Sequence, residues 1–284
     1  MHRFGVGGAS ATASAGAIAL ALALGLVFIA PLPAAAAPPT SVQLEELTSP
    51  ELRDAVRAGK TTVIIPVGGT EQSGPHLALG KHNVRVALLA ARIAEALGNA
   101  LVAPVVAYVP EGSITPPSSH MRFPGTISIS DGAFQAVLDG AARSLKQAGF
   151  TDIVLIGDHG GYQSQLKAVA AKLNHDWTAT PARAHFIDAY YRVTQTAFVQ
   201  ALRAKGLNDA QIGVHAGTAD TALTLATDPS KVRPDQYAPA AQGAPGNGVN
   251  GDPRPASAAL GQLGVELIVT ETVAAIRKAT TARQ

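Results

Sequence analysis

Thr62-Val-Ile-Ile-Pro-Val67 is an apolar run that passes directly into a glycine-rich turn, Gly68-Gly-Thr-Glu-Gln-Ser-Gly-Pro-His-Leu-Ala-Leu-Gly-Lys-His-Asn83. The run predicts a buried strand, and the turn carries Glu71, His76 and His82. Open α/β folds bind their ligands at the edge of the sheet where such strands end. The segment therefore predicts a strand of an α/β sheet with a site at its carboxyl end.

Strands and helices alternate along the rest of the chain. Strands are predicted over residues 62–67, 101–106, 126–130, 152–157 and 184–187, and helices over 83–97, 131–149, 162–174, 190–205, 217–226 and 256–278. Asn83 and Asp131 are expected to cap their helices. This alternation predicts a single α/β domain over residues 38–284, with a mostly parallel sheet between layers of helices.

Residues 1–37 have the order of a secretory signal peptide. Arg3 is followed by an apolar core from Ala17 to Ala30 and by a run of small residues. The core is short for a membrane span, so an uncleaved anchor is the weaker alternative. There is no cysteine, which excludes a lipobox and disulfides. We expect a Sec-type signal and a bacterial protein that is periplasmic or secreted.

Charge and motif content exclude several classes of function. The chain has 22 Lys and Arg against 20 Asp and Glu, with no basic run for nucleic acid. Ser73 lacks the flanking glycines of a hydrolase nucleophile elbow, and no phosphate-binding glycine loop is present. We therefore expect a small-molecule substrate, no nucleic-acid partner, and no membrane association after signal cleavage.

Two further polar clusters follow glycines at predicted strand and helix ends. His159 lies in Gly157-Asp-His-Gly-Gly161, and His215 and Asp220 lie in His215-Ala-Gly-Thr-Ala-Asp-Thr221. Imidazoles and carboxylates that converge from separate turns suit zinc, manganese or iron. Each residue alone has a structural alternative, as a helix cap, a solvated side chain or a partner of the helix dipole. Their joint placement favours a metal site.

Five motifs in order resemble those of the creatininase (creatinine amidohydrolase) family. They are Pro66–Leu77, Ser119–Thr126, Ile156–Gly161, His215–Thr221 and Gly251–Ala256. The resemblance implies a three-layer α/β/α sandwich, a homo-oligomer that is often a hexamer, and a metal centre. It also implies metal-dependent hydrolysis of a C–N bond in a cyclic amide, formamide or small peptide, with metal-activated water as the nucleophile.

The resemblance implies four metal ligands in this chain, which are Glu71, His82, His159 and Asp220. Ser73 stands where the family has a histidine ligand, and His82 stands where an aspartate bridges two metals. Because a neutral imidazole does not bridge two cations as a carboxylate does, we expect one divalent ion. Zinc is expected first, with manganese or iron as alternatives.

The motif positions also suggest roles around the metal. His215 and Asp158 are expected to move protons, and His120 to orient the substrate. The expected substrate-binding residues are His76, Ser73, Gly160, Gly161 and Tyr162. The competing function is a periplasmic small-molecule-binding protein without turnover, which the replaced ligands at Ser73 and His82 favour.

Overall fold

The computed structural model describes residues 41–242 and 246–281. Residues Pro38–Gln284 form one compact unit. The predicted signal peptide, residues 1–37, lies outside the described residues. Export and the division into a signal and a mature domain therefore stay predictions.

Four parallel strands form the sheet. Their spatial order is β2 (Ala100–Val102), β1 (Thr62–Val67), β3 (Asp152–Gly157) and β4 (Arg183–Phe186). β1 and β3 pair along their whole length, with Val67 opposite Gly157. Every residue of β1 and β3 is buried, as expected of central strands covered on both faces. The parallel register brings the carboxyl ends of β1 and β3 to the same edge.

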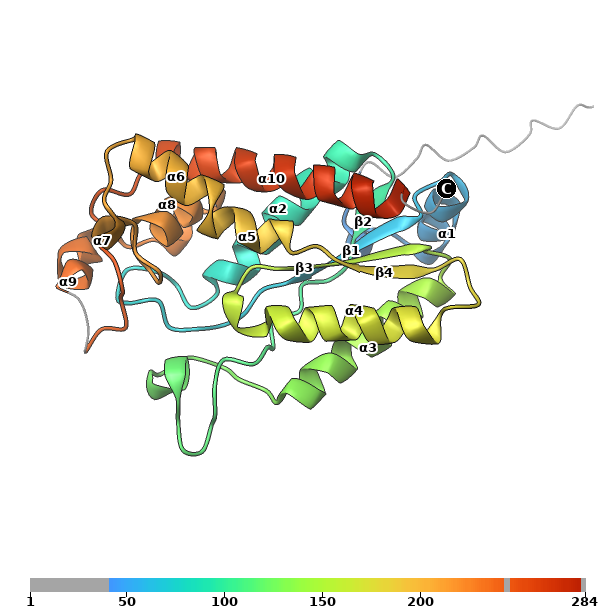
Figure 1. The fold of residues 1–284 in the computed structure, drawn as a ribbon, viewed down its shortest axis with the longest axis horizontal. Helices are drawn as coiled ribbons and strands as arrows, with labels where there is room; N and C mark the ends of the chain where they lie inside the picture. Colours follow the sequence, from blue (N-terminus) through green and yellow to red (C-terminus); the bar gives the residue numbers. More distant parts are fainter. Residues whose placement is uncertain (1–40, 243–245, 282–284) are drawn as a thin grey trace, which may run out of the picture. The chain divides into compact units, whose positions relative to one another are not determined.

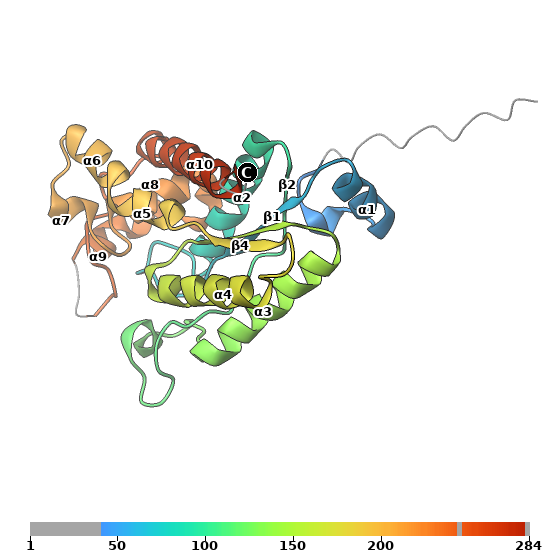
Figure 2. The ribbon, with the colours of Figure 1, turned by 45° about the vertical axis from the view of Figure 1, so that its right-hand side comes forward.

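Helices cover both faces of the sheet and complete three layers (Figures 1 and 2). One layer contains α2 (Lys81–Leu97), α5 (Ala189–Gln195), α6 (Ala197–Ala204), α8 (Thr218–Thr227) and α10 (Ala258–Thr281). The opposite layer contains α3 (Asp131–Gln147) and α4 (Gln163–Asp176). Three short helices complete the fold, namely α1 (Ser49–Arg57), α7 (Asp209–Ile212) and α9 (Tyr237–Ala241). The predicted α/β sandwich around a parallel sheet is confirmed.

Two apolar cores fill the spaces between the sheet and its helix layers. Ile64 of β1 belongs to the core shared with α2 and α10, whereas Val63 and Ile65 belong to the core shared with α3 and α4. Successive side chains of a strand point to opposite faces, so an uninterrupted apolar run serves both cores. This double burial makes the ends of β1 and β3 a rigid base for the site.

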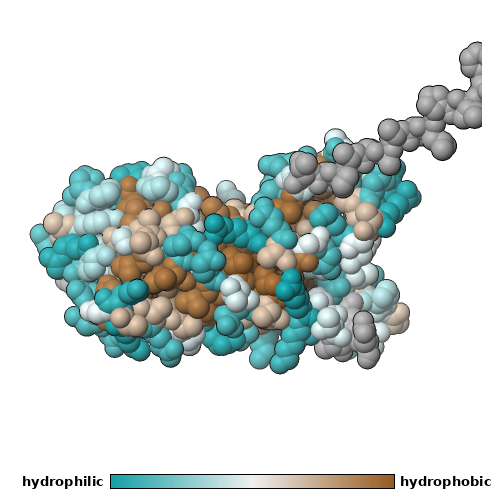
Figure 3. All heavy atoms as spheres, turned by 90° about the horizontal axis from the view of Figure 1, so that it is seen from above, coloured by the Kyte–Doolittle hydropathy of each residue, from teal (hydrophilic) through white to brown (hydrophobic). Residues whose placement is uncertain are grey.

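The closing helix α10 packs tightly against α8. A Cβ atom at Gly261 would lie 1.8 Å from the carbonyl oxygen of Ala222. By length and composition, α10 is the one helix among the described residues that could cross a membrane. Its buried residues, among them Val265, Ile268 and Ile276, pack into the core. Figure 3 shows apolar side chains gathered on the face of the molecule on which α10 lies.

Two predicted elements were wrong, and the strand predicted over residues 101–106 is shortened to Ala100–Val102. Residues 126–130 form no strand, because the amide of Ile127 bonds to Thr70 and that of Ile129 bonds to Val109. These partners lie in two separate loops, so no ladder develops. The helix predicted over 190–205 is divided at Thr196, where φ is −123° and ψ is −90°, into α5 and α6.

The predicted helix caps were also wrong. Ser130, not Asp131, caps α3 by accepting a hydrogen bond from the amide of Ala133. α2 begins at Lys81, and Asn83 instead accepts a hydrogen bond from the amide of Gly69 through Oδ1 at 2.9 Å. This earlier start places Lys81 and His82 in the first turn of the helix.

Candidate metal site and its cavities

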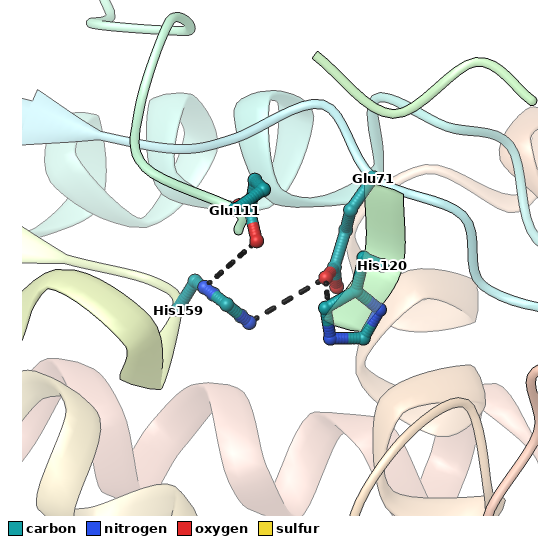
Figure 4. Close-up of side chains that lie close together, drawn as sticks. All are labelled: Glu71, Glu111, His120 and His159. Carbon is teal, nitrogen blue, oxygen red and sulfur yellow. Dashed lines mark ion pairs between the residues drawn. The ribbon is translucent and has the colours of Figure 1, made fainter. Parts of the chain in front are cut away.

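The candidate site lies at the edge of the sheet where β1 and β3 end. Glu71 follows β1, and His159 follows β3. Glu111 and His120 come from the long loop after β2, with His120 in the short 3₁₀ helix Ser119–Arg122. Figure 4 shows these four side chains pointing toward one another from their separate segments. Because parallel strands end on one side of the sheet, residues far apart in sequence meet here.

Glu71, Glu111, His120 and His159 form the four-ligand cluster. One candidate ligand atom from each lies within 4.8 Å of the others. Oε2 of Glu71 is 3.3 Å from Nε2 of His120 and 3.4 Å from Nε2 of His159. Oε2 of Glu111 is 3.4 Å from Nδ1 of His159. Ligands bound about 2.1 Å from one tetrahedral ion are roughly 3.4 Å apart, so the two contacts of Oε2 of Glu71 already have ligand spacing. His159 can give the ion only one of its two nitrogens, so its contact with Glu111 through Nδ1 is not a second ligand pair of that ion.

The hydrogen bonding of the two carboxylates fits a cation. Oε2 of Glu71 and both oxygens of Glu111 are buried and accept no hydrogen bond from any residue in the described ranges. Buried carboxylate oxygens need a donor or a cation. Two carboxylates and two imidazoles are a donor set that suits Zn²⁺, Mn²⁺ or Fe²⁺. The residues present therefore fit one divalent ion.

Gly69 makes room for the Glu111 carboxylate. The residue has a φ of 150°, and a Cβ atom there would lie 2.8 Å from Oε1 of Glu111. Only glycine combines that backbone conformation with so close an approach. The glycine-rich turn after β1 thus admits a carboxylate from a different loop.

Burial keeps the two imidazoles of the cluster neutral. Desolvation lowers the pKa of His159 to about 3, although the charge of Glu71 acts in the opposite direction. Desolvation also lowers the pKa of His120. The neutral ring is the form that binds a metal, so both rings are ready to do so at pH 7.

The two carboxylates differ in charge state. Desolvation and the nearby Glu71 raise the pKa of Glu111 to about 9, so without a cation Glu111 holds a proton at pH 7. Burial also acts to raise the pKa of Glu71, but the Lys81 ammonium and the His82 ring outweigh it and hold that pKa well below its usual value. Glu71 is therefore the permanent anion of the cluster.

Three basic side chains from α2 fill the inner side of the site. Nζ of Lys81 donates to Oε1 of Glu71 at 2.8 Å, and Nε2 of His82 lies 2.7 Å from the same oxygen. Nδ1 of His82 lies 2.6 Å from Oδ2 of Asp158, to which Nε of Arg85 donates at 2.7 Å. These residues are buried, so their charges interact strongly.

Two of the expected ligands, His82 and Asp220, are not members of the four-ligand cluster and are engaged by charged partners. Both ring nitrogens of His82 face carboxylate oxygens, one of them on Glu71. Asp220 accepts hydrogen bonds from Arg85 at 3.1 Å and from the amide of Ala216 at 2.8 Å. The expected ligand set and the four-ligand cluster therefore share two members and differ in two.

His215 lies beside the cluster, as expected for a proton-transfer residue. Its ring centroid is 4.5 Å from that of His120, and its Nδ1 is 3.7 Å from Oε1 of Glu71. Nε2 lies 3.0 Å from the carbonyl oxygen of Gln72 and 3.2 Å from the side-chain nitrogen of the same residue, so Gln72 holds the ring through Nε2 and Nδ1 faces the cluster. Desolvation, together with the Lys81 charge, lowers the pKa of His215 to about 4.

Asp158, the other expected proton carrier, lies behind His82. Its Oδ1 accepts a hydrogen bond from Tyr190 at 2.8 Å, and its Oδ2 contacts His82 and Arg85. It is 4% exposed and borders the first cavity. Asp158 thus contacts His82 directly and holds its ring by a hydrogen bond.

Two of the five expected substrate-binding residues line a cavity. Gly160 borders the first cavity and Gly161 the second. Ser73, His76 and Tyr162 are buried and are not among the described residues that line either cavity. Nε2 of His76 contacts the hydroxyl of Thr221 at 2.9 Å, and Tyr162 donates to the carbonyl oxygen of Val67 at 2.8 Å. These contacts hold the turn after β1 in place.

The four-ligand cluster lies between two cavities. The first, of about 310 Å³, is bordered by Glu71, His215 and the basic residues of α2, and also by Phe198 and Leu223. The second, of about 520 Å³, is bordered by Glu111 and the N-terminus of α3. His120 and His159 line both. A substrate at the cluster can therefore extend to either side.

Sequence reasoning missed Glu111, Lys81 and Arg85. Glu111 is a lone acidic residue in the long loop after β2. Lys81 lay outside the helix predicted over residues 83–97, whereas in the structure it is a cation in the first turn of α2, which opposes the helix dipole and needs a reason. That reason is Glu71, which approaches only in the folded chain.

Known proteins with this architecture include solved creatininases. A crystal structure of creatinine amidohydrolase matches with a TM-score of 0.69 and 26% identity over 86% of this chain and 99% of that chain. A creatininase with Mn has a TM-score of 0.68 and 26% identity over 85% and 99%. A creatininase variant of the Zn–Zn type has a TM-score of 0.68 and 25% identity over 86% and 100%.

Shorter stretches match relatives named as hydrolases. A mycofactocin precursor peptide peptidase of Mycolicibacterium smegmatis is 37% identical over 119 residues, 40% of this chain and 45% of the relative. A 3-dehydro-scyllo-inosose hydrolase of Thermotoga maritima is 28% identical over 123 residues, 43% and 37%. These matches span less than half of each relative. A family model for creatinine amidohydrolase, however, matches residues 45–276, and together with the fold it shows that this chain belongs to the creatininase family.

Proposed function

We propose that this protein is a metal-dependent hydrolase of a C–N bond in a small amide, with one divalent ion held by the four-ligand cluster. The observation that carries the proposal is the meeting of three hydrogen-bond-deficient carboxylate oxygens with two neutral imidazoles between two cavities. An ion bound there supplies a Lewis acid that polarises a carbonyl and lowers the pKa of water. Family membership and the Mn and Zn–Zn creatininase structures support this proposal.

The chain's own residues supply the remaining chemistry. The His215 ring is neutral at pH 7 and faces the cluster through Nδ1, so it is placed to take a proton from the attacking water and return it to the leaving nitrogen. Asp158 and Arg85 hold His82, which in turn holds Glu71 in position. Apolar side chains such as Phe198 line part of the first cavity. The active groups are thus preorganised.

The two cavities support substrates with substituents on both sides of the scissile bond. Short peptides and substituted amides or formamides meet this description better than a compact ring that fills one cavity. A screen of the purified full chain would compare creatinine, formamides and dipeptides, each with added Zn²⁺, Mn²⁺ or Fe²⁺. We expect metal-stimulated cleavage of at least one extended amide.

Variants of the cluster test the assignment directly. His159→Ala is expected to lose both bound metal and hydrolysis, whereas His175→Ala, whose side chain is 90% exposed, keeps both. Retention of metal and activity by His159→Ala would refute the proposed site.

A second function is favoured by the basic side chains of α2. Lys81 and Arg85 already pair with Glu71, Asp158 and Asp220, as they would in a binding protein that needs no metal. Metal content below about a tenth of an equivalent after purification, with no hydrolysis in the screen, would favour this binding function.

We also propose that the protein is exported and forms a homo-oligomer. The leader-like composition of residues 1–37 supports export, and the apolar side chains on the α10 face support self-association. Mass spectrometry of the N-terminus in the periplasmic fraction and light scattering of the purified protein test these two points. An intact leader or a monomer at all concentrations would refute the corresponding point.

A further inference from the structure

Lys81 is the buried cation nearest to the four-ligand cluster among the described residues. Its side chain and that of Glu71 are both 0% exposed, and Nζ donates to Oε1 of Glu71 at 2.8 Å. Nζ also lies 3.9 Å from Oδ2 of Asp220. The ammonium group is therefore enclosed by two carboxylates on the inner side of the cluster.

The position of Lys81 is unfavourable by itself. Burial removes the ammonium from water, and the first turn of α2 carries the positive end of the helix dipole. The buried carboxylates of Glu71 and Asp220 offset both costs. We therefore expect the positive charge of Lys81 to act on the carboxylates of Glu71 and Asp220.

The contacts divide the Glu71 carboxylate into two halves. Oε1 receives Lys81 and lies 2.7 Å from Nε2 of His82, whereas Oε2 faces the imidazoles of His120 and His159. An ion in the cluster thus has Oε2 available, and a second ion at Oε1 would have to displace an ammonium group. A creatininase variant of the Zn–Zn type has this fold with two zinc ions, so the fold itself does not restrict the number to one.

We propose that Lys81 is an internal cation that takes the place of a second metal ion, neutralising Oε1 of Glu71 and restricting the cluster to one ion. This inference rests on the proposed metal-dependent function for the first ion. Lys81 acts as a positioning residue through Glu71 and does not itself contact substrate. A second ion would bind where the Lys81 ammonium now lies, between Oε1 of Glu71 and Oδ2 of Asp220.

Equilibrium metal binding tests the proposal with three variants of the full chain. Zn²⁺ stoichiometry and affinity are measured by dialysis with elemental analysis and by calorimetry. Lys81→Met removes the charge but keeps the volume, so the first Zn²⁺ is expected to bind at least about tenfold more tightly. Lys81→Ala also opens space, and a second Zn²⁺ per chain is expected. Lys81→Arg keeps the charge and is expected to bind one ion as the natural protein does.

Lys167→Met, at an exposed position of α4, is the matched control and leaves binding unchanged. Unaltered stoichiometry and affinity in both Lys81→Met and Lys81→Ala would overturn the inference. If these variants unfold without metal, recovery of folding on addition of Zn²⁺ supports it. Failure to fold with and without Zn²⁺, while Lys81→Arg folds, overturns it in favour of a purely structural lysine.

The outcomes separate this inference from the proposed function. If the natural protein binds no metal but Lys81→Ala binds an ion, the proposed function fails, and of the inference only the part in which Lys81 takes the place of a metal ion stands. If the natural protein binds one ion and hydrolyses amides, while the Lys81 variants bind as it does, the function stands and the role of Lys81 fails.

Discussion

Glu111→Gln is predicted to change metal affinity and metal-free stability in opposite directions. Both oxygens of Glu111 accept no hydrogen bond from the described residues, and its side chain is 0% exposed. In the four-ligand cluster it supplies one of two anionic ligands. Removal of a residue that only hydrogen-bonds to a metal ligand costs about 10–100-fold in metal affinity. Removal of a ligand itself, such as Glu111, is therefore expected to cost at least about 100-fold.

The metal-free protein is predicted to become more stable at pH 7. The pKa of Glu111 is raised from its ordinary value of 4.5 to about 9. On unfolding at pH 7 the carboxyl ionises, and the span from 4.5 to 7 is about 2.5 pH units at about 1.4 kcal/mol each. Burial of Glu111 therefore costs the folded state up to about 3.5 kcal/mol, which Glu111→Gln removes.

The pH dependence fixes the sign of this effect. A group whose pKa is raised on folding contributes its full stability below pH 4.5 and loses it as the pH rises toward 9. The stability difference between Glu111→Gln and the natural protein should therefore be smallest near pH 4.5 and grow with pH. Urea unfolding in the presence of EDTA at several pH values measures it, and calorimetry measures the Zn²⁺ affinity.

Two results would refute this reasoning about Glu111. One is a Zn²⁺ affinity that stays within a few fold of that of the natural protein. The other is a metal-free variant that is less stable by the same amount at every pH, which would mean that Glu111 is held by contacts rather than by a suppressed charge. Glu95→Gln, at an exposed position of α2, is the control and should alter neither quantity.

Three further predictions follow from single contacts. Tyr190→Phe removes the hydrogen bond to Asp158 inside the core and is expected to lower the free energy of unfolding by about 1–3 kcal/mol, measured by urea titration; no loss would mean that a water replaces the hydroxyl. Gly261→Ala places a methyl group 1.8 Å from the α8 backbone and is expected to lower the free energy of unfolding by at least about 2 kcal/mol. Gly140→Ala is the control: no atom lies within 4 Å of its new Cβ, so the change should be neutral or raise the free energy of unfolding by up to about 1 kcal/mol. Burial lowers the pKa of His76 from 6.5 to about 4, so the contribution of His76 to folding stability is full above pH 6.5 and is lost as the pH falls through 4. In the metal-free protein, His76→Gln should therefore reduce the number of protons taken up on unfolding near pH 5 by about one. An unchanged slope of the unfolding free energy against pH would contradict this.

Much of the fold could be predicted because its signals are local. The apolar runs at Thr62–Val67 and Asp152–Gly157 became the two central strands with the predicted bounds. The short strand predicted over residues 126–130 did not form, because a strand also needs a partner in register, and its amides bond to two separate loops. Local sequence patterns therefore predict the periodicity of an element well, but they do not predict which segment a strand pairs with.

The candidate site divides in the same way. Glu71 and His159 could be identified because each follows a buried strand in a glycine-rich turn, and both lie in the four-ligand cluster. His82 and Asp220 were expected beside them by resemblance, yet their polar atoms face other charged groups. Glu111 carried no local signal that distinguished it from a solvated loop glutamate.

The sequence by itself determined the α/β sandwich, the family and the edge of the sheet that carries the site, because hydrophobic periodicity and short motifs are properties of neighbouring residues. Only the tertiary structure decided which side chains share one buried volume. It placed Lys81 against Glu71 and brought Glu111 to His159. Electrostatic energies depend on distance and burial, and neither is written in the spacing of residues along the chain.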